Sequence, residues 1–514
     1  MKKNTLVCLI GAALSSTAFA GTSASALPEA MGANRAPSNQ PNVIVVLLDD
    51  AGYADISANG GTFPTPNIDK LAADGQNFSS FYMSAPVSSP ARASLLTGRV
   101  GVRTGMYGKQ MAVFEETDKD GLPKTEVTMA EMLRDEGYKT FMLGKWHLGW
   151  GKDGIEHVPT RHGFQEWYGI PFSTDMNNTN PEFRLKPIKK SITSPAVFKD
   201  PAFMAKWIER DNQLASFKDG RSKNEYFQVP LYHSFSSENG TKFEDNLIGT
   251  VNQTTFLRDI TSRTVEYINN NKDEPFFIYF NPPESHVPLF NSPEFIGKTE
   301  TPYGDVMVEQ DYSIGRIMRA LKLNSIDDNT IVVFTSDNGP WLGYADRGAA
   351  GSAKPFKDGK SSPYEGGARV PGIITWSGQI PAGANDSMFS ALDLMPTIAS
   401  MTGAKLPNVE IDGIDQSGLL LRGEDAPRDF VPVFMRGQLV GFRKGDYKLT
   451  YTGVSLISDG VKKKPKMYNL AKDIGEKRNI AKKEKAKYAD MIKMADEYVT
   501  SLGKPAEPLF DFDD

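Results

Sequence analysis

The sequence has little cysteine, little histidine and no strong excess of either charge. Its only cysteine is Cys8, which lies in the N-terminal leader described below, so we expect a mature chain without disulfides. A net charge of −5 argues against nucleic acid as the main partner. It does not exclude an anionic substrate, because local arginine and lysine side chains can form a positive pocket in an acidic protein. No apolar run in the sequence is long enough to cross a membrane.

The chain begins with the pattern of a secretory signal. A basic start and a short apolar run precede Ala18-Phe19-Ala20, which forms an A-x-A cleavage site. Ala24-Ser25-Ala26 is a second candidate for cleavage. We therefore predict a signal peptide over 1–20, a linker over 21–41, and export to the periplasm or the medium of a bacterium.

Buried strands alternate with amphipathic helices along most of the chain. Asn42 to Leu48 is a continuous apolar run rich in β-branched residues, which is typical of a strand buried in a parallel sheet. Similar runs cover 140–143, 276–280, 331–335 and 372–375, and helical patterns cover 66–74, 128–137, 261–270 and 307–321. This alternation predicts an α/β sheet covered by helices on both faces.

The pattern changes in two places. After residue 425 we expect short antiparallel strands over 429–437, 440–443 and 447–452, followed by an amphipathic helix over 483–502. We predict a large α/β domain over 42–425 and a smaller α+β subdomain over 426–514. Between Thr174 and Thr254 no clear period exists, which fits either an insertion that shapes a binding site or a mobile surface loop.

Acidic and amide side chains follow two of the expected strands. Asp49 and Asp50 come directly after the first strand, and Asp337 and Asn338 follow the run at 331–335. Ligands of α/β sheets bind at the carboxyl ends of the strands, and adjacent carboxylates there are costly without a cation. Three carboxylates and one amide oxygen form an all-oxygen site that suits Ca²⁺ or Mg²⁺ and is poor for Zn²⁺.

A second candidate site begins at Ser88. Ser88 stands two residues before Pro90 and four before Arg92, and Thr97-Gly98-Arg99 closes the helical run that follows. Because proline suits the first helical turn, we expect Ser88 at a helix N-terminus, where backbone N–H groups and the helix dipole face an anion. Arg92 adds a permanent charge with a geometry suited to tetrahedral oxyanions. An isolated S-x-P-x-R pattern is more often a simple helix cap.

The twelve residues from Ser88 to Arg99 resemble the signature of the type I sulfatases of the alkaline-phosphatase superfamily, and 467–481 resembles that family's C-terminal stretch. The resemblance implies a large, mostly parallel mixed sheet between helices, with an antiparallel C-terminal subdomain packed on a helix. It also implies that a maturation enzyme oxidises Ser88 to formylglycine, since no cysteine lies outside the leader. The ligands of one divalent ion, most often calcium, would be Asp49, Asp50, Asp337, Asn338 and residue 88, with magnesium as the other option.

Three further motifs match this family. They are 144–149 with Lys145 and His147, 281–288 with His286, and 360–371 with Lys360. By resemblance, Lys145 binds the sulfate and the formylglycine oxygen, and Arg92 holds the charge on the sulfuryl oxygens. His147 takes the proton that releases the bound sulfate. His286 and Lys360 assist the leaving oxygen. For His157, His162 and His233 we favour structural or surface roles.

Two other functions fit the same residues. A phosphate or phosphonate ester hydrolase of the superfamily would use Ser88 unmodified, although the chain is too poor in histidine for a two-zinc centre. An inactive exported binding protein is the other alternative. For a sulfatase, we expect a sulfated glycan as substrate, either an algal galactan or a host glycosaminoglycan, beside an insertion that bears Trp167, Tyr168, Trp207 and Tyr226. The candidate sugar contacts are Asp175, Asn177, Trp341 and Arg347.

Overall fold

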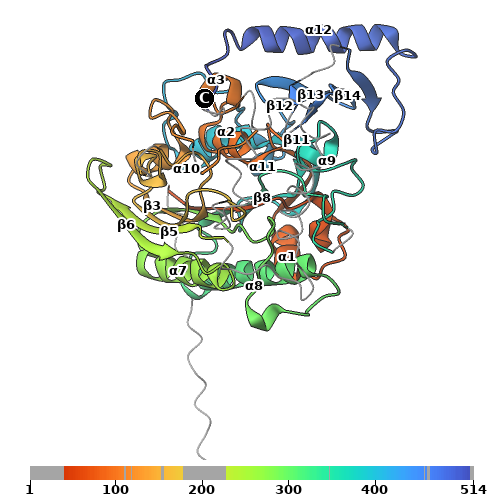
Figure 1. Cartoon of the computed structure of the whole chain (residues 1–514). Helices are drawn as coiled ribbons and strands as arrows, with labels where there is room; N and C mark the ends of the chain where they lie inside the picture. Colours follow the sequence, from red (N-terminus) through yellow and green to blue (C-terminus); the bar gives the residue numbers. More distant parts are fainter. Residues whose placement is uncertain are drawn as a thin grey trace, which may run out of the picture. The chain divides into compact units, whose positions relative to one another are not determined.

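An eleven-stranded sheet forms the centre of the fold (Figure 1). The computed structural model describes residues 40–108, 112–116, 118–151, 155–176, 227–345, 348–455, 458–459 and 464–509. The expected signal peptide and nearly all of the expected linker lie outside these ranges. Among the described helices, none combines the length and the apolar character that crossing a membrane requires.

The sheet is mixed and mostly parallel at its centre. Its strand order is β11-β2-β10-β8-β1-β7-β3-β4-β5-β6, and β9 pairs with β2. The central strand β1 (Asn42–Leu48) runs parallel to β7 (Phe276–Asn281) and β8 (Thr330–Ser336). Beyond β7 lie β3 (Lys139–Lys145) and β4 (Glu166–Ile170), both parallel to it. The remaining strands are β2 (Gln76–Tyr82), β5 (Pro230–Ser236), β6 (Phe243–Thr250), β9 (Arg369–Val370), β10 (Gly372–Trp376) and β11 (Gly383–Ser390).

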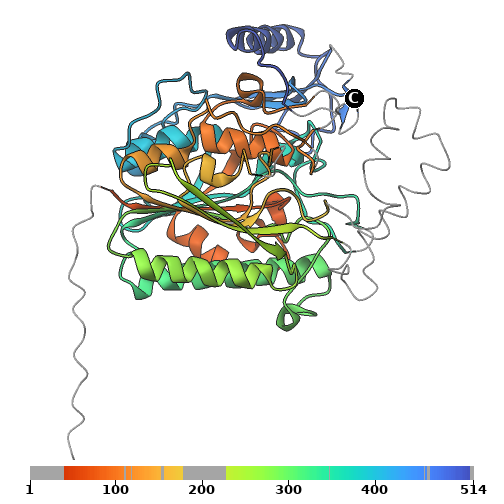
Figure 2. The same ribbon diagram turned by 60° about the vertical axis from the view of Figure 1, so that its left-hand side comes forward.

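Helices cover both faces of this sheet, as the alternation of the sequence predicts. Figures 1 and 2 show α7 (Phe256–Asn271) and α8 (Pro302–Leu323) on one face, with α2 (Ser88–Thr97) and α10 (Leu394–Thr402) on the other. Strand β1 serves both layers: Val43, Val45 and Leu47 belong to one hydrophobic cluster, while its other apolar side chains belong to the second. Alternate side chains of a strand point to opposite faces, so a strand covered on both sides is apolar throughout.

The other described helices that precede the C-terminal part are short. They are α1 (Pro66–Asp74), α3 (Gly101–Thr104), α4 (Met129–Asp135), α9 (Glu365–Ala368) and α11 (Ser417–Arg422). Single 3-10 turns occur at Tyr53–Asp55, Ser57–Asn59, Pro159–Arg161, Pro293–Phe295 and Ala391–Asp393. The bounds of α1 are those expected, because Pro66 opens the helix and Gly75 follows its last residue.

A second, antiparallel sheet forms the C-terminal part. It has the order β12 (Phe430–Met435), β13 (Gln438–Lys444), β14 (Tyr447–Thr450) and β17 (Lys466–Asn469), and α12 (Lys485–Ser501) packs on it. A short pair, β15 (Val454–Ser455) and β16 (Ser458–Asp459), lies between β14 and β17 in sequence. The expected strands and helix of this part are confirmed.

Two predictions about the region around 174–254 are wrong. The stretch from 230 to 250 is not irregular: β5 and β6 form a hairpin at the edge of the large sheet. Six of the eight residues of β6 are exposed and the other two are half-buried, so this strand needs no alternation of apolar and polar residues. Trp167 and Tyr168 do not decorate an open insertion either, since they lie buried in β4. Trp207 and Tyr226 lie outside the described residues.

Candidate active site

The predicted functional residues gather at the carboxyl ends of neighbouring strands. Asp49 and Asp50 follow β1, Asp337 and Asn338 follow β8, and Lys145 ends β3. His286 lies in the loop after β7, the strand between β1 and β3 in the sheet. Parallel strands that lie side by side bring their carboxyl ends to one edge, and that edge is where α/β sheets place ligands.

Three carboxylates form the centre of the site. Asp49, Asp50 and Asp337 are fully buried, and each offers an oxygen that lies within 4.8 Å of the others. Asp50 adopts a left-handed backbone conformation with φ of 58°, and its N–H donates to Asp337 Oδ1 at 3.1 Å. The side-chain amide of Asn338 donates to Asp50 Oδ1 at 2.7 Å.

Ser88 completes this cluster. It is the first residue of α2, after Val87 in an extended conformation. Its Oγ lies 3.5 Å from Asp49 Oδ1 and 3.4 Å from Asn338 Oδ1. All five predicted metal ligands therefore come together. The donors are oxygens only, and their formal charge is −3 before any cation is counted, so the set fits a hard divalent cation such as Ca²⁺.

Three cationic side chains surround the carboxylates. Lys145 Nζ lies 2.6 Å from Asp49 Oδ2, and Lys360 Nζ lies 2.8 Å from Asp50 Oδ2. Arg92 Nε lies 2.9 Å from Asp337 Oδ2, and its Nη2 lies 3.4 Å from Asp49 Oδ1. Each carboxylate therefore has a cationic partner, and the guanidinium of Arg92 bridges two of them.

Burial and charge set the protonation of these groups. Burial raises the pKa of Asp49, but the charges of Lys145 and Arg92 outweigh it and leave that pKa below its usual value. Burial lowers the pKa of Lys145, and the charge of Asp49 offsets only part of this effect. For Lys360 the balance is reversed. Burial lowers its pKa, but the carboxylates of Asp50 and Asp49 raise it by more, so the pKa lies above its usual value and Lys360 is protonated.

The two predicted histidines flank the same cluster. His147 Nε2 lies 2.9 Å from the carbonyl oxygen of Phe114, so this nitrogen carries the proton and Nδ1 is the acceptor. Burial, together with the charges of Lys145 and Arg92, holds the pKa of His147 well below its usual value. The ring is therefore neutral and can accept a proton. His286 Nε2 lies 3.6 Å from Asp50 Oδ2.

Sequence reasoning missed two serines of the site. Ser173 Oγ lies 3.3 Å from Lys145 Nζ and 3.4 Å from His286 Nδ1, so it connects two predicted residues. Ser285 Oγ donates to the carbonyl oxygen of Asp49 at 2.6 Å. Ser173 follows β4 by three residues, so the rule that pointed to Asp49 could have found it if β4 had been recognised as a strand.

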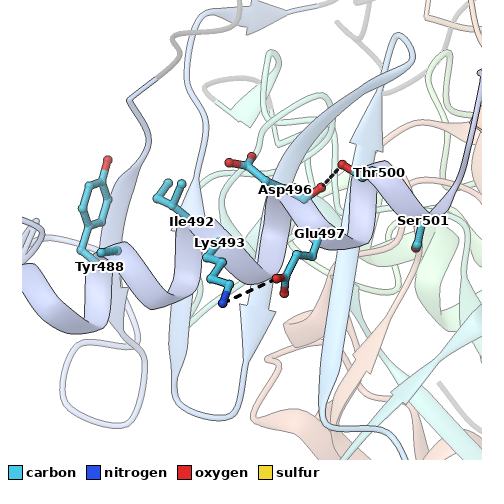
Figure 3. A pocket seen from close by; sticks show the side chains of 8 residues that line it. Tyr488, Ile492, Lys493, Asp496, Glu497, Thr500 and Ser501 are labelled. Atoms are coloured by element: carbon cyan, nitrogen blue, oxygen red, sulfur yellow. Dashed lines mark hydrogen bonds and ion pairs between the residues drawn. The ribbon is translucent and has the colours of Figure 1, made fainter.

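The candidate sugar contacts are less complete. Asp175 and Trp341 are both partly buried. Asp175 lies two residues after Ser173, and Trp341 lies three residues after Asn338. Asn177 and Arg347 lie outside the described residues. A surface hollow lies along α12 (Figure 3), and none of the residues that line it belongs to the cluster around Asp49. The remaining histidines have structural contacts; for example, His162 stacks on Trp146.

Comparisons with known proteins agree with this geometry. The profile of the sulfatase family matches residues 41–404. Human arylsulfatase A is 34% identical over 473 residues, which cover 88% of this chain and 85% of that protein. The crystal structure of the PsFucS1 sulfatase from Pseudoalteromonas sp. is 26% identical, with a TM-score of 0.72 and 92% of each chain covered. The crystal structure of Ps i-CgsB in complex with k-i-k-neocarrahexaose is 28% identical, with a TM-score of 0.66, and covers 91% of this chain and 94% of that one.

The match to the family profile spans the large sheet, from the residue before β1 to the second residue after α10, and includes every predicted catalytic and metal-binding residue. The match to arylsulfatase A extends over most of both chains. The fold has the mixed, mostly parallel sheet with a small antiparallel sheet that the resemblance implied. The chain belongs to the sulfatase family and is a sulfuric ester hydrolase.

Proposed function

We propose that the protein removes sulfate esters from a sulfated glycan, with a formylglycine made from Ser88 as its nucleophile and one calcium ion as its metal. The observation that carries this proposal is the position of Ser88. Its Oγ lies at the N-terminus of α2 and within 3.5 Å of an oxygen of Asp49 and of Asn338. A nucleophile on residue 88 would therefore lie beside the residues that hold the metal and at the anion-binding end of a helix.

Asp49, Asp50, Asp337 and Asn338 would hold the calcium ion. When bound, it would lower the cost of ionising a hydroxyl of the hydrated aldehyde near neutral pH. Arg92 and Lys145 are placed to hold the charge on the sulfuryl oxygens, because both lie against Asp49 beside Ser88. Preorganised donors of this kind are usually the largest contribution to such catalysis.

Proton transfers are assigned to the remaining side chains. Lys360 is protonated and can donate to the leaving oxygen, and His286, which lies near the same oxygen of Asp50, can assist its departure. His147 is neutral and can take the proton of the second hydroxyl of residue 88. A positioned general acid or base contributes roughly 10²–10⁴ in rate.

The glycan part of the proposal is supported by one structural relative. Ps i-CgsB was solved with k-i-k-neocarrahexaose, a bound oligosaccharide. The expected leader agrees with action on polysaccharides outside the cell, and the conversion of Ser88 would need a maturation enzyme in the same bacterium. Asp175 and Trp341, on loops at the same edge as Ser88, are our candidates for sugar contacts.

The test is a tryptic mass spectrum of the peptide that carries residue 88, from protein made in its native host. We expect this peptide to be lighter than the serine form by two hydrogens, or to carry the hydrated aldehyde. Ser88→Ala, prepared in the same way, is the matched control and should show neither the mass change nor activity on sulfated oligosaccharides. Unmodified serine at residue 88 in a preparation active on sulfated oligosaccharides would contradict the formylglycine part of the proposal.

A further inference from the structure

The loop that carries Lys360 has an unusual backbone. Asp358 and Ser361, on either side of Lys360, have φ values of 66° and 65°, in the left-handed region that non-glycine residues rarely adopt. Such conformations are unfavourable for side-chain-bearing residues and persist only where the surrounding structure holds them. The position of Lys360 therefore depends on contacts that hold this loop from outside.

One residue of the C-terminal subdomain contacts both ends of the loop. The Nζ of Lys357 donates to the carbonyl oxygen of Glu476 at 3.4 Å. The backbone N–H of Glu365, the first residue of α9, donates to Glu476 Oε2 at 2.7 Å. Gly366 N–H donates to the carbonyl oxygen of Lys357 at 2.9 Å and closes the loop on itself. Lys360 lies between these two points of attachment.

Glu476 is itself held in a charged network. It is fully buried and has a φ of 48°. Its Oε1 lies 3.3 Å from Lys448 Nζ and accepts from Thr450 Oγ1 at 3.0 Å. Lys448 Nζ also lies 2.9 Å from Glu365 Oε1, so this lysine joins the subdomain to α9 by a second route.

The network links the two sheets of the molecule. Lys448 and Thr450 belong to β14 of the C-terminal sheet, whereas Glu365 opens the helix that leads directly into β9 of the large sheet. Burial lowers the pKa of Lys448, but the carboxylates of Glu365 and Glu476 raise it by more. The pKa therefore lies above its usual value, and Lys448 is charged. A buried charge with two partners fixes their separation more tightly than apolar packing would.

We propose that Glu476 and Lys448 are positioning residues of the sulfatase: they hold the 357–365 loop so that the Lys360 ammonium reaches Asp50 and the leaving oxygen. The C-terminal subdomain would thereby control departure of the leaving group, although among the described residues neither Glu476 nor Lys448 forms a hydrogen bond or ion pair with Asp50 or Ser88. This inference rests on the proposed role of Lys360 in assisting the leaving oxygen.

The test uses a series of aryl sulfates whose phenol leaving groups differ in pKa. For the mature, calcium-loaded enzyme, kcat/KM is measured for the wild type, Glu476→Gln, Lys448→Met and Lys360→Ala. We expect both network variants to lose little on the best leaving group and up to about 100-fold on the poorest, the scale expected when a catalytic group is misplaced by about 1 Å. The double variant Lys360→Ala with Glu476→Gln should lose no more than Lys360→Ala alone, since both act on one step.

Arg428→Gln is the matched control. Arg428 forms another buried ion pair, with Asp393, and its other hydrogen bonds go to the carbonyl oxygens of Asp412 and Phe430 rather than to the Lys360 loop. This variant should lower stability and reduce activity equally for every leaving group. If Glu476→Gln does not fold, Thr450→Val removes one donor to Glu476 at nearly constant volume and should give the same dependence in weaker form.

Two results would separate the possible failures. If Lys360→Ala depends on the leaving group but the network variants lose activity uniformly, in parallel with their loss of thermal stability, the network is only structural and our inference is wrong. If Lys360→Ala itself shows no dependence on the leaving group, the proposed role of Lys360 is wrong, whatever the network variants do.

Discussion

Lys145 Nζ lies 2.6 Å from Asp49 Oδ2, and both side chains are fully buried. Neither charge has bulk water around it, so each depends on the other for compensation, and Arg92 places a second positive charge beside Asp49. Loss of one partner from a buried pair leaves an uncompensated charge, which costs far more than the pair itself contributes. The site is therefore stable only as a whole, with its carboxylates and cations in balance.

We expect Lys145→Met to lower the free energy of unfolding by about 3–5 kcal/mol. It should also reduce turnover by about 10²–10³, the usual effect of removing one charge-stabilising donor. Lys139, at the other end of β3, is the matched control: its pairs with Glu238 and Glu274 are solvent-exposed, so Lys139→Met should cost no more than about 1 kcal/mol. Urea unfolding measures both, and equal stability of the two variants would contradict the buried-pair argument.

Calcium should stabilise the folded protein. At a free concentration 100 times its Kd, a ligand that binds only the native state contributes about 2.7 kcal/mol. We expect chelation of Ca²⁺ to lower the melting temperature and abolish activity, and re-addition to restore both. Asp337→Asn removes one carboxylate of the cluster and should shift the calcium response to higher concentration. Stronger stabilisation by Zn²⁺ than by Ca²⁺ would contradict the all-oxygen assignment.

The sequence alone placed most of the site because its residues follow strands that are easy to recognise. Strands β1 and β8 each contain a continuous apolar run, 43–48 and 331–334, so their ends, and with them Asp49, Asp50 and Asp337, could be located from these runs. Ser173 follows β4, whose residues Glu166 to Ile170 are too few and too mixed to stand out. A residue of the site was missed where the strand before it was missed.

Strand β2 is an element of the fold that the sequence pattern also failed to reveal. It has polar residues at four of the five positions before Phe81, yet it lies inside the large sheet, between β11 and β10. Pairing on both sides makes such a segment a strand, and no local propensity records these partners. The network of Glu476 could not be predicted for a related reason: it joins residues that lie 111 positions apart in sequence.

The helix α4 offers a prediction that separates stability from activity. Thr128 caps this helix: its Oγ1 accepts from the N–H of Glu131 at 3.1 Å, and the carboxylate of Glu131 accepts from the N–H of Thr128 at 2.9 Å. Thr128→Ala should lower the free energy of unfolding by about 1 kcal/mol and leave kcat unchanged. Thr128→Ser keeps the capping oxygen and is the control. A changed kcat at saturating substrate would show that the cap also serves the site.

The last prediction concerns Glu284, a buried carboxyl two residues before His286. Both of its carboxylate oxygens are buried without a hydrogen-bond partner. Burial, and then the charges of Glu309 and Asp49, raise its pKa well above the usual value. A group whose pKa is raised on folding contributes fully to stability below the unfolded-state pKa of about 4.3, and that contribution is lost as pH rises toward the folded-state pKa. Glu284→Gln cannot ionise, so it does not lose this contribution.

We therefore expect the free energy of unfolding of Glu284→Gln to increase relative to that of the wild type as pH rises above about 4.3. The difference between the two should change by at most about 1.4 kcal/mol per pH unit. Below that pH the two proteins should differ by a constant amount. Urea unfolding over a pH series, at fixed calcium, gives the two curves. Glu294→Gln, which removes an exposed carboxyl from the 3-10 turn at Pro293–Phe295, should run parallel to the wild type throughout. Parallel curves for Glu284→Gln as well would mean that Glu284 is ionised in the folded protein, with a partner that compensates its charge.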